Sequence, residues 1–396
     1  MRSDAIEVGD IFRQFGAAYQ QEHKLPLQQL KAMTAIARCR TRALGGHVDV
    51  CDECGYERIS YNSCRNRHCP KCQSLARERW LLARQKELLP ICYFHVVLTL
   101  PDELNRLCLV NQPVMYDLLF RAGSETILDL GQDARHIGGK VGLIGVLHTW
   151  GQNLMDHPHL HCIVTGGGLS ADGQRWVSPK KMTPKKDFFI HVNIISDLFK
   201  KKFLAYLKQA YQQSRLQFVG DTAYLAQGNN FQQLVDKLYE KKWNSYCKKP
   251  FGGPEKVLSY LGRYTHRVAI ANNRIVKLEA GKVTFKWRDY RDGNKNKLMT
   301  LDVFEFMRRF LLHILPHGFF KIRYYGILAS RNHRTDLELC QRLLQVADKI
   351  ARQHQKLAWE DLMLELFDID VRRCPVCGKG RLVAKQLIPW NSHDPP

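Results

Sequence analysis

The short segment HPHLH contains a histidine pair that is typical of a metal site. Side chains alternate between the two faces of a β-strand, so His159 and His161 would point the same way and could bind one divalent ion. The third ligand stays open: Gln152 would lie across from His159 in a hairpin, and His148 and then His157 are the alternatives. Imidazole nitrogens with an amide oxygen suit Mn²⁺ at least as well as Mg²⁺, whereas Mg²⁺ is the more abundant ion in cells.

A second set of chemically useful residues is Tyr260 and Tyr264. Pro254 is well suited to the first position of a helix, and a four-residue spacing places both phenols on one helix face. Arg263 and Arg267 are cationic neighbours that can bind phosphate and favour the phenolate over the phenol, whose free pKa is near ~10. The alternative is an aromatic stripe that belongs to a core.

Two CxxC pairs predict structural zinc in the first hundred residues. Cys51 and Cys54 form one pair and Cys69 and Cys72 the other, and fourteen residues separate the pairs. Four thiolates with this spacing complete a tetrahedron around Zn²⁺. The same region holds further potential ligands for a second zinc ion, with surface or supporting roles as the alternative: Cys39, His47, Cys64 and His68.

Two further features belong with the cysteines. Cys374 and Cys377 near the C-terminus supply half of another zinc site, whose partners the sequence does not identify. Arg65 and Arg67 make the N-terminal module a predicted DNA-docking surface.

The charge balance predicts a polyanionic partner. The 396 residues include 60 Lys and Arg against 38 Asp and Glu, a net charge of +22. Such a chain gains affinity for nucleic acid by phosphate contacts and counterion release. The N-terminus lacks the apolar region of a signal peptide, and the longest apolar stretch is too short to span a membrane. With 13 cysteines, six of them in CxxC pairs, we expect a reduced, cytoplasmic protein that associates with the nucleoid when bound to DNA.

The hydrophobic pattern predicts an α+β protein with four parts: a helical segment (1–38), a zinc-binding domain with the helix that follows it (39–89), a mixed domain (90–330) and a C-terminal helix with a cysteine knuckle (331–396). Strands are expected at 93–100, 141–152 and 159–164, and strand-like stretches at 267–278 and 282–290. Residues 230–247 are expected to be helical and to lead through a basic linker into the tyrosine helix. A long helix is expected at 335–355.

Together these motifs resemble a known family. The segments are YFHVVLTLP, HTWGQNLMDHPHLHCIVTGGG, PFGGPEKVLSYLGRYTHRVAI and GFFKIRYYG. They are similar to the two-tyrosine rolling-circle transposases of bacterial insertion sequences, members of the His-hydrophobic-His (HUH) endonuclease superfamily with an N-terminal zinc module. The resemblance implies an antiparallel nuclease sheet with the histidine pair on a central strand and the tyrosine helix nearby. It implies His159 and His161 as metal ligands, Gln152 as the third, and Tyr260 and Tyr264 as nucleophiles.

The predicted function is therefore that of a transposase. It would nick and rejoin single DNA strands through a 5′-phosphotyrosine, using Mg²⁺ or Mn²⁺ in catalysis and Zn²⁺ in the fold. Its partner would be DNA, mainly single-stranded element ends and targets. One alternative is a non-enzymatic zinc-ribbon DNA-binding regulator, which leaves the histidines and tyrosines unexplained. The other is a metal-dependent hydrolase that activates water, which leaves the tyrosines unexplained.

Overall fold

An antiparallel sheet of five strands forms the centre of the protein. The computed structural model describes residues 5–85, 87–179, 190–251, 256–257, 262, 268–289, 292–345 and 358–390. The strand order is β12-β4-β5-β3-β8, so the histidine strand β5 is central, and the expected α+β class is confirmed. The strands are β3 (Tyr93–Thr99), β4 (Gly142–Trp150), β5 (Asp156–Thr165), β8 (Ser245–Phe251) and β12 (Ile322–Gly326).

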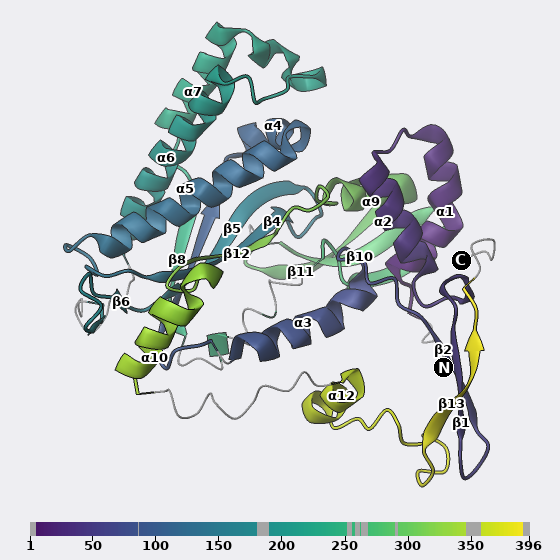
Figure 1. Ribbon diagram of the computed structural model, residues 1–396. Helices are drawn as coiled ribbons and strands as arrows, with labels where there is room; N and C mark the ends of the chain where they lie inside the picture. The colour runs from purple at the N-terminus through teal and green to yellow at the C-terminus, as the bar shows by residue number, and fades with distance from the viewer. Residues whose placement is uncertain are drawn as a thin grey trace.

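Helices cover one face of this sheet, as Figure 1 shows. Alternate strand residues such as Val96, Leu147 and Leu160 join the helices in the largest hydrophobic core. Gly123 allows α5 to approach β5 closely, because a Cβ at this position would lie only 2.9 Å from a Leu160 methyl group. The helices of this layer are α4 (Asn105–Val110), α5 (Gln112–Gln132), α6 (Val192–Gln212) and α7 (Gly228–Glu240).

The opposite face carries the histidines and is crossed by helix α3 (Pro70–Gln85). Trp80 of α3 donates a hydrogen bond from its indole nitrogen to the Tyr324 hydroxyl at 2.8 Å. A second core on this side joins apolar residues of β4 and β5 with Val257 and with Leu337 and Cys340, next to and within α10 (Glu338–Leu343). A small hairpin, β6 (Gly168–Leu169) with β7 (Trp176–Val177), lies beside it.

A second sheet shares a core with the N-terminal helices. It contains β9 (Ile275–Glu279), β10 (Lys282–Asp289) and β11 (Lys295–Asp302), and is followed by α9 (Val303–Leu312). Helices α1 (Val8–Glu22) and α2 (Leu27–Arg38) pack against it, with the rings of Phe12 and Phe310 5.4 Å apart. The division of the chain at residues 38, 89 and 330 stays a prediction, and packing crosses all three of these boundaries.

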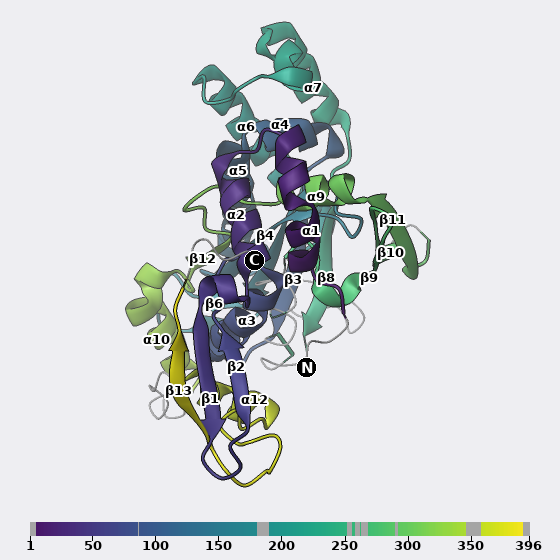
Figure 2. The same cartoon turned by 90° about the vertical axis from the view of Figure 1, so that its right-hand side faces the viewer.

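The two ends of the chain meet in a third sheet. Strands β1 (Gly46–Cys51) and β2 (Glu57–Tyr61) form a hairpin, and β13 (Leu382–Ile388) pairs with β1 in antiparallel orientation. Figures 1 and 2 show this ribbon, with α12 (Trp359–Phe367) nearby, at the opposite end of the molecule from α7. The sequence predicted the hairpin region as a module but not the strand β13.

Two predicted helices are wrong in extent. Helix α7 ends at Glu240, and residues 245–251 form the edge strand β8, in which Tyr246 pairs with Val97. An edge strand tolerates Pro250, because one side of an edge strand has no neighbour to receive its backbone hydrogen bonds. In the second case a helix was expected at 335–355, but the α-helix α10 ends at Leu343; residues 346–355 lie outside the described residues. In the part of the chain that the structure describes, no helix is both long and apolar enough to cross a membrane.

Candidate metal centre and zinc clusters

Three imidazoles converge on the face of the central sheet that α3 crosses. His148 lies on β4, His159 and His161 lie on β5, and one ring nitrogen of each falls within 4.8 Å of the others. The register places His148 directly opposite His159, so the three side chains share one face. His148 and His161 are buried, at 2% and 8% exposure, and His159 is partly exposed. This arrangement offers three nitrogen ligands for one ion, the number that catalytic metal sites commonly take from the protein.

Hydrogen bonds made by the Nδ1 atoms orient the rings of His159 and His161. His159 Nδ1 donates to the carbonyl oxygen of His157 at 2.6 Å, and His161 Nδ1 lies 2.9 Å from Nε2 of His95. The Nε2 atoms of His159 and His161 then lie 3.1 Å apart. Adjacent ligands of an ion with metal–nitrogen distances near 2.1 Å are separated by about 3 Å, so this pair fits a single ion.

His95 is a candidate functional residue that the sequence reasoning missed. Its contact with His161 is of the type that fixes the tautomer and direction of a metal ligand. The signal in the sequence was its position within the strand YFHVVLTL, where a histidine interrupts a largely apolar run. In the structure this side chain is only 2% exposed. A buried polar side chain in such a strand needs a partner, and here the partner is a metal-site histidine.

The expected position of Gln152 is wrong. Strand β4 ends at Trp150, which pairs with Asp156, and the register shifts between His148 and Trp150. Gln152 therefore falls in the turn between β4 and β5, where its carbonyl oxygen accepts a hydrogen bond from Arg274 at 2.6 Å. The alternative His148 is the residue that lies across from His159. His157, the further alternative, contributes its carbonyl group instead, and burial lowers the pKa of its ring.

Tyr260, Tyr264, Arg263 and Arg267 lie outside the described residues. Residues on either side of them are described. Val257 is fully buried in the core that contains Ile144, Val146 and Ile163 of the histidine face. Gly262 lies against α3, since a Cβ there would be 2.8 Å from a Leu81 methyl group.

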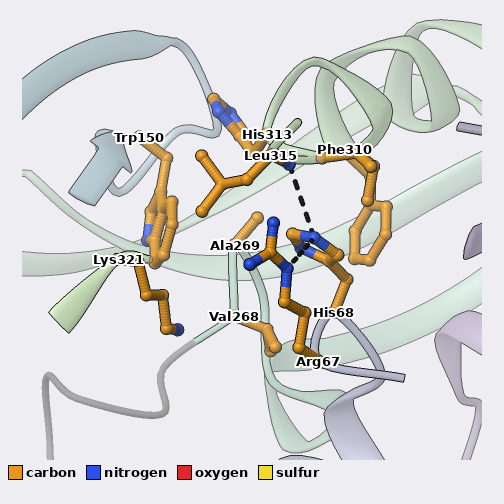
Figure 3. Close-up of a pocket in the computed structure, with 10 residues that line it drawn as sticks. Arg67, His68, Trp150, Val268, Ala269, Phe310, His313, Leu315 and Lys321 are labelled. Atoms are coloured by element: carbon orange, nitrogen blue, oxygen red, sulfur yellow. Dashed lines mark hydrogen bonds between the residues drawn. The ribbon is translucent and has the colours of Figure 1, made fainter. Parts of the chain in front are cut away.

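A basic pocket adjoins the histidines. Figure 3 shows Trp150 and Lys321 on one side and Arg67 with His68 beside them. The Trp150 ring stacks on His148 with centroids 4.8 Å apart, so the pocket and the metal centre share a wall. Among the described residues, those that line the pocket carry no carboxylate; they are Arg67, His68, Trp150, Val268, Ala269, Phe310, His313, Ile314, Leu315 and Lys321.

Burial and mutual repulsion shape the charges of this pocket. Burial, with a further contribution from the Arg67 guanidinium, lowers the pKa of Lys321 to about 7. Burial lowers the pKa of His68 to about 3, and the charges of Arg67 and Lys321 act in the same direction. An anion bound here would relieve this repulsion, so the pocket is suited to a phosphate group.

The cysteines form two clusters, and their grouping differs from the predicted one. Cys39, Cys64, Cys69 and Cys72 make one cluster, while Cys51 and Cys54 join Cys374 and Cys377 in the other. In the first cluster, Sγ of Cys72 lies 3.6 Å from Sγ of both Cys39 and Cys64. Hydrogen bonds among the four thiols lower the pKa of Cys39 and Cys72 and raise the pKa of Cys64 and Cys69. The spacing argument paired Cys51 and Cys54 with Cys69 and Cys72 because it could not foresee partners from the other end of the chain.

The remaining residues of the module have other roles. His47 lies 3.3 Å from the Asp49 carboxylate, and His68 Nε2 accepts from the Leu315 amide at 3.4 Å, so neither joins a cysteine cluster. Arg67 donates to the carbonyl groups of Pro316 and Phe319 and thereby ties the module to the rest of the protein. Arg65 is exposed, and its contact with DNA stays a prediction.

Comparisons with known proteins identify the family. Residues 142–335 match the family model described as "Putative transposase", and residues 11–100 match the one described as "Transposase zinc-binding domain". The chain is 48% identical over 390 residues to "Putative transposase y4qJ" of Sinorhizobium fredii, covering 98% of this chain and 97% of that protein. It is 27% identical over 363 residues to "Transposase for insertion sequence element IS801" of Pseudomonas savastanoi pv. phaseolicola, covering 91% and 84%.

No solved structure matches the chain. The two family models and the near-complete coverage of a relative at 48% identity decide the family. The chain belongs to the two-tyrosine transposases of bacterial insertion sequences, with an N-terminal transposase zinc-binding domain.

Proposed function

We propose that this transposase cuts and rejoins single DNA strands through a 5′-phosphotyrosine, with Tyr260 and Tyr264 as nucleophiles and a divalent ion on His148, His159 and His161. The convergence of these three imidazoles on one face of the sheet carries the proposal. Two tyrosines allow a second cleavage while the first strand is still attached, as rolling-circle transposition needs.

Chain connectivity supports a position of the tyrosines near the histidines. Tyr260 follows Val257 by three residues, and an extended chain covers at most about 11 Å in that distance. Tyr264 precedes Val268 by four residues, which limits their separation to about 14 Å. Val257 packs in the core on the histidine face, and Val268 lines the pocket that shares Trp150 with the metal centre. Both ends of the tyrosine segment therefore start from the side of the sheet where the reaction is proposed.

The proposed reaction is an in-line exchange at phosphorus. The phenol loses its proton and its oxygen forms a bond to phosphorus, the bond from phosphorus to the 3′-oxygen breaks, and the released 3′-oxygen gains a proton to become a hydroxyl. A divalent ion on the three imidazoles would supply a Lewis acid at the scissile phosphate. The reverse attack by a 3′-hydroxyl restores the phosphodiester without ATP, because the phosphotyrosine bond retains the energy.

Features of the pocket support it as the path of the DNA strand. Lys321 and Arg67 bring positive charge to a site without carboxylates among its described lining residues. Trp150 forms the wall between this pocket and the imidazoles, so a phosphate held by Lys321 would belong to a strand that continues into the metal centre. The net charge of +22 supports such binding over the whole surface.

The test is an adduct assay with end-labelled, single-stranded DNA that carries an element end, in the presence of Mn²⁺ or Mg²⁺. The wild-type protein should form a covalent adduct that survives a denaturing gel. The double substitution Tyr260→Phe and Tyr264→Phe should abolish the adduct and retain the shift on a native gel, whereas the exposed Tyr224→Phe should behave as wild type.

Other outcomes would overturn the proposal. An adduct that persists in the double variant would exclude these tyrosines as nucleophiles. Free cut ends without any adduct would favour a hydrolase that activates water. A native shift with neither adduct nor cutting, over a range of ions and element ends, would favour a DNA-binding regulator.

A further inference from the structure

We infer that a Zn²⁺ site joins the two ends of the chain, with Cys51 and Cys54 from the N-terminal module and Cys374 and Cys377 from the C-terminal knuckle as its four ligands. The matched zinc-binding domain covers residues 11–100 and so contains only two of these cysteines. The inference is independent of the reaction proposed above.

The sulfur positions fit a tetrahedral zinc site. Sγ of Cys51 lies 3.7 Å from Sγ of Cys377, and Sγ of Cys54 lies 3.7 Å from Sγ of Cys374. All four sulfur atoms fall within 4.8 Å of one another. With zinc–sulfur distances near 2.3 Å, the edge of the tetrahedron is about 3.8 Å. The four thiols are therefore already at the separations that one Zn²⁺ ion imposes.

Both cysteine pairs sit in the same kind of turn. In the sequences CDECG and CPVCG, a glycine follows the second cysteine, and Gly55 and Gly378 adopt left-handed backbone with φ of 71° and 65°. Each donates its amide to the carbonyl oxygen of the first cysteine at 3.1 Å. Glycine adopts this backbone without strain, and the resulting tight turn aims both thiols of a pair at one point.

The surroundings of the sulfur atoms support a thiolate site as well. The amide of Gly380 donates to Sγ of Cys377 at 3.3 Å, a hydrogen bond that favours the thiolate form. A Cβ at residue 380 would lie 2.5 Å from Sγ of Cys51, so only glycine allows the two turns to approach this closely. Two hydrogen bonds join the turns. The Asp52 amide donates to the Arg381 carbonyl oxygen at 3.1 Å, and the Arg381 amide donates to the Asp52 carboxylate at 2.6 Å.

Little else holds the C-terminal strand in place. Strand β13 pairs with β1, yet its central residues are exposed, and Leu387 and Val383 retain 80% and 46% of their accessible surface. So little apolar burial does not offset the conformational entropy lost on ordering the strand. In small modules of this type, metal binding supplies folding free energy. Zinc at this cluster would therefore be the main reason that the C-terminal knuckle docks on the N-terminal ribbon.

The first test counts zinc in the full-length protein, purified under reducing conditions, by elemental analysis. The wild type should contain two ions per chain, one in each cysteine cluster. The double substitution Cys374→Ser and Cys377→Ser should lower this to one, and so should Cys51→Ser with Cys54→Ser. Cys92→Ser, outside both clusters, should leave two.

The second test uses Lys385, which lies in β13, as a protease site. Trypsin should spare it in the wild type and in Cys92→Ser, but cut there rapidly in both double variants. A count that stays at two in the C-terminal double variant would overturn the inference, as would a wild-type count of one with Lys385 still protected. The zinc count and the phosphotyrosine assay are independent tests, because the first measures bound metal and the second measures DNA cleavage. Failure of one proposal can therefore be distinguished from failure of the other.

Discussion

The spacing of two histidines on a strand carries more information than either histidine alone. His159 and His161 share a face because strand side chains alternate, and that part of the metal centre followed from the sequence. The third imidazole did not, because its identity depends on where the hairpin turns. The turn after Trp150, together with the shifted register next to His148, decides that His148 rather than Gln152 faces His159. No local pattern in the sequence reports that register.

This difference gives a prediction about ion binding. His148→Ala should weaken Mn²⁺ binding by more than roughly 100-fold, since even the residues that only support metal ligands are worth 10- to 100-fold. Gln152→Ala should change it by less than about 3-fold, because Gln152 occupies the turn and its contact with Arg274 is made by its backbone carbonyl, which the substitution keeps. Isothermal titration with MnCl₂ measures both. Comparable losses in the two variants would show that the amide also binds the ion and that His148 is not the decisive third ligand.

At the scale of elements, predictability follows burial. Strands β3, β4 and β5 were predicted because their side chains are apolar and buried on one or both faces. Side chains of β11 alternate between exposed and half-exposed, those of β13 are exposed almost throughout, and β8 lies at the edge of its sheet. Such strands are held by backbone pairing, which leaves no hydrophobic period in the sequence.

The residue that precedes β12 supplies a prediction about pH. Lys321 has a pKa of about 7 in the folded protein against an ordinary 10.5, so between these values the unfolded chain binds a proton that the folded one does not. Stability therefore rises with pH over that range as far as this group is concerned. Lys321→Met removes the buried charge and should raise the melting temperature at pH 7 more than at pH 9.5.

Thermal denaturation at both pH values measures this difference. Lys237→Met, an exposed lysine on α7 at the far end of the molecule, controls for loss of charge in general and should shift the melting temperature equally at both. An equal shift for Lys321→Met at the two pH values would mean that Lys321 has an ordinary pKa.

At the scale of the whole molecule, the sequence identified the family better than it identified the contacts between distant parts of the chain. Motifs that lie within about twenty residues of one another specified the nuclease sheet and half of each zinc site. Contacts between distant parts were out of reach: β1 with β13, α1 with α9, and Arg67 with the carbonyl groups of Pro316 and Phe319. The Arg67 contacts bring the zinc-binding domain against the pocket beside the three histidines, and the DNA path that we propose runs from this domain to the histidines.

A continuous DNA path makes a prediction about salt. Binding of single-stranded DNA should weaken linearly in a plot of log affinity against log salt, with a slope of about −0.7 for each phosphate that the protein neutralises. If Lys321 holds one of these phosphates, Lys321→Gln should reduce the steepness by about 0.7, measured by fluorescence anisotropy at pH 6, where this lysine is charged. Lys237→Gln, far from the pocket, should leave the slope of the wild type. A slope for Lys321→Gln that equals the wild-type slope would place the strand outside the pocket. At pH 9 the wild-type lysine is itself neutral, so the difference in slope between wild type and Lys321→Gln should disappear if the contact depends on this ammonium group.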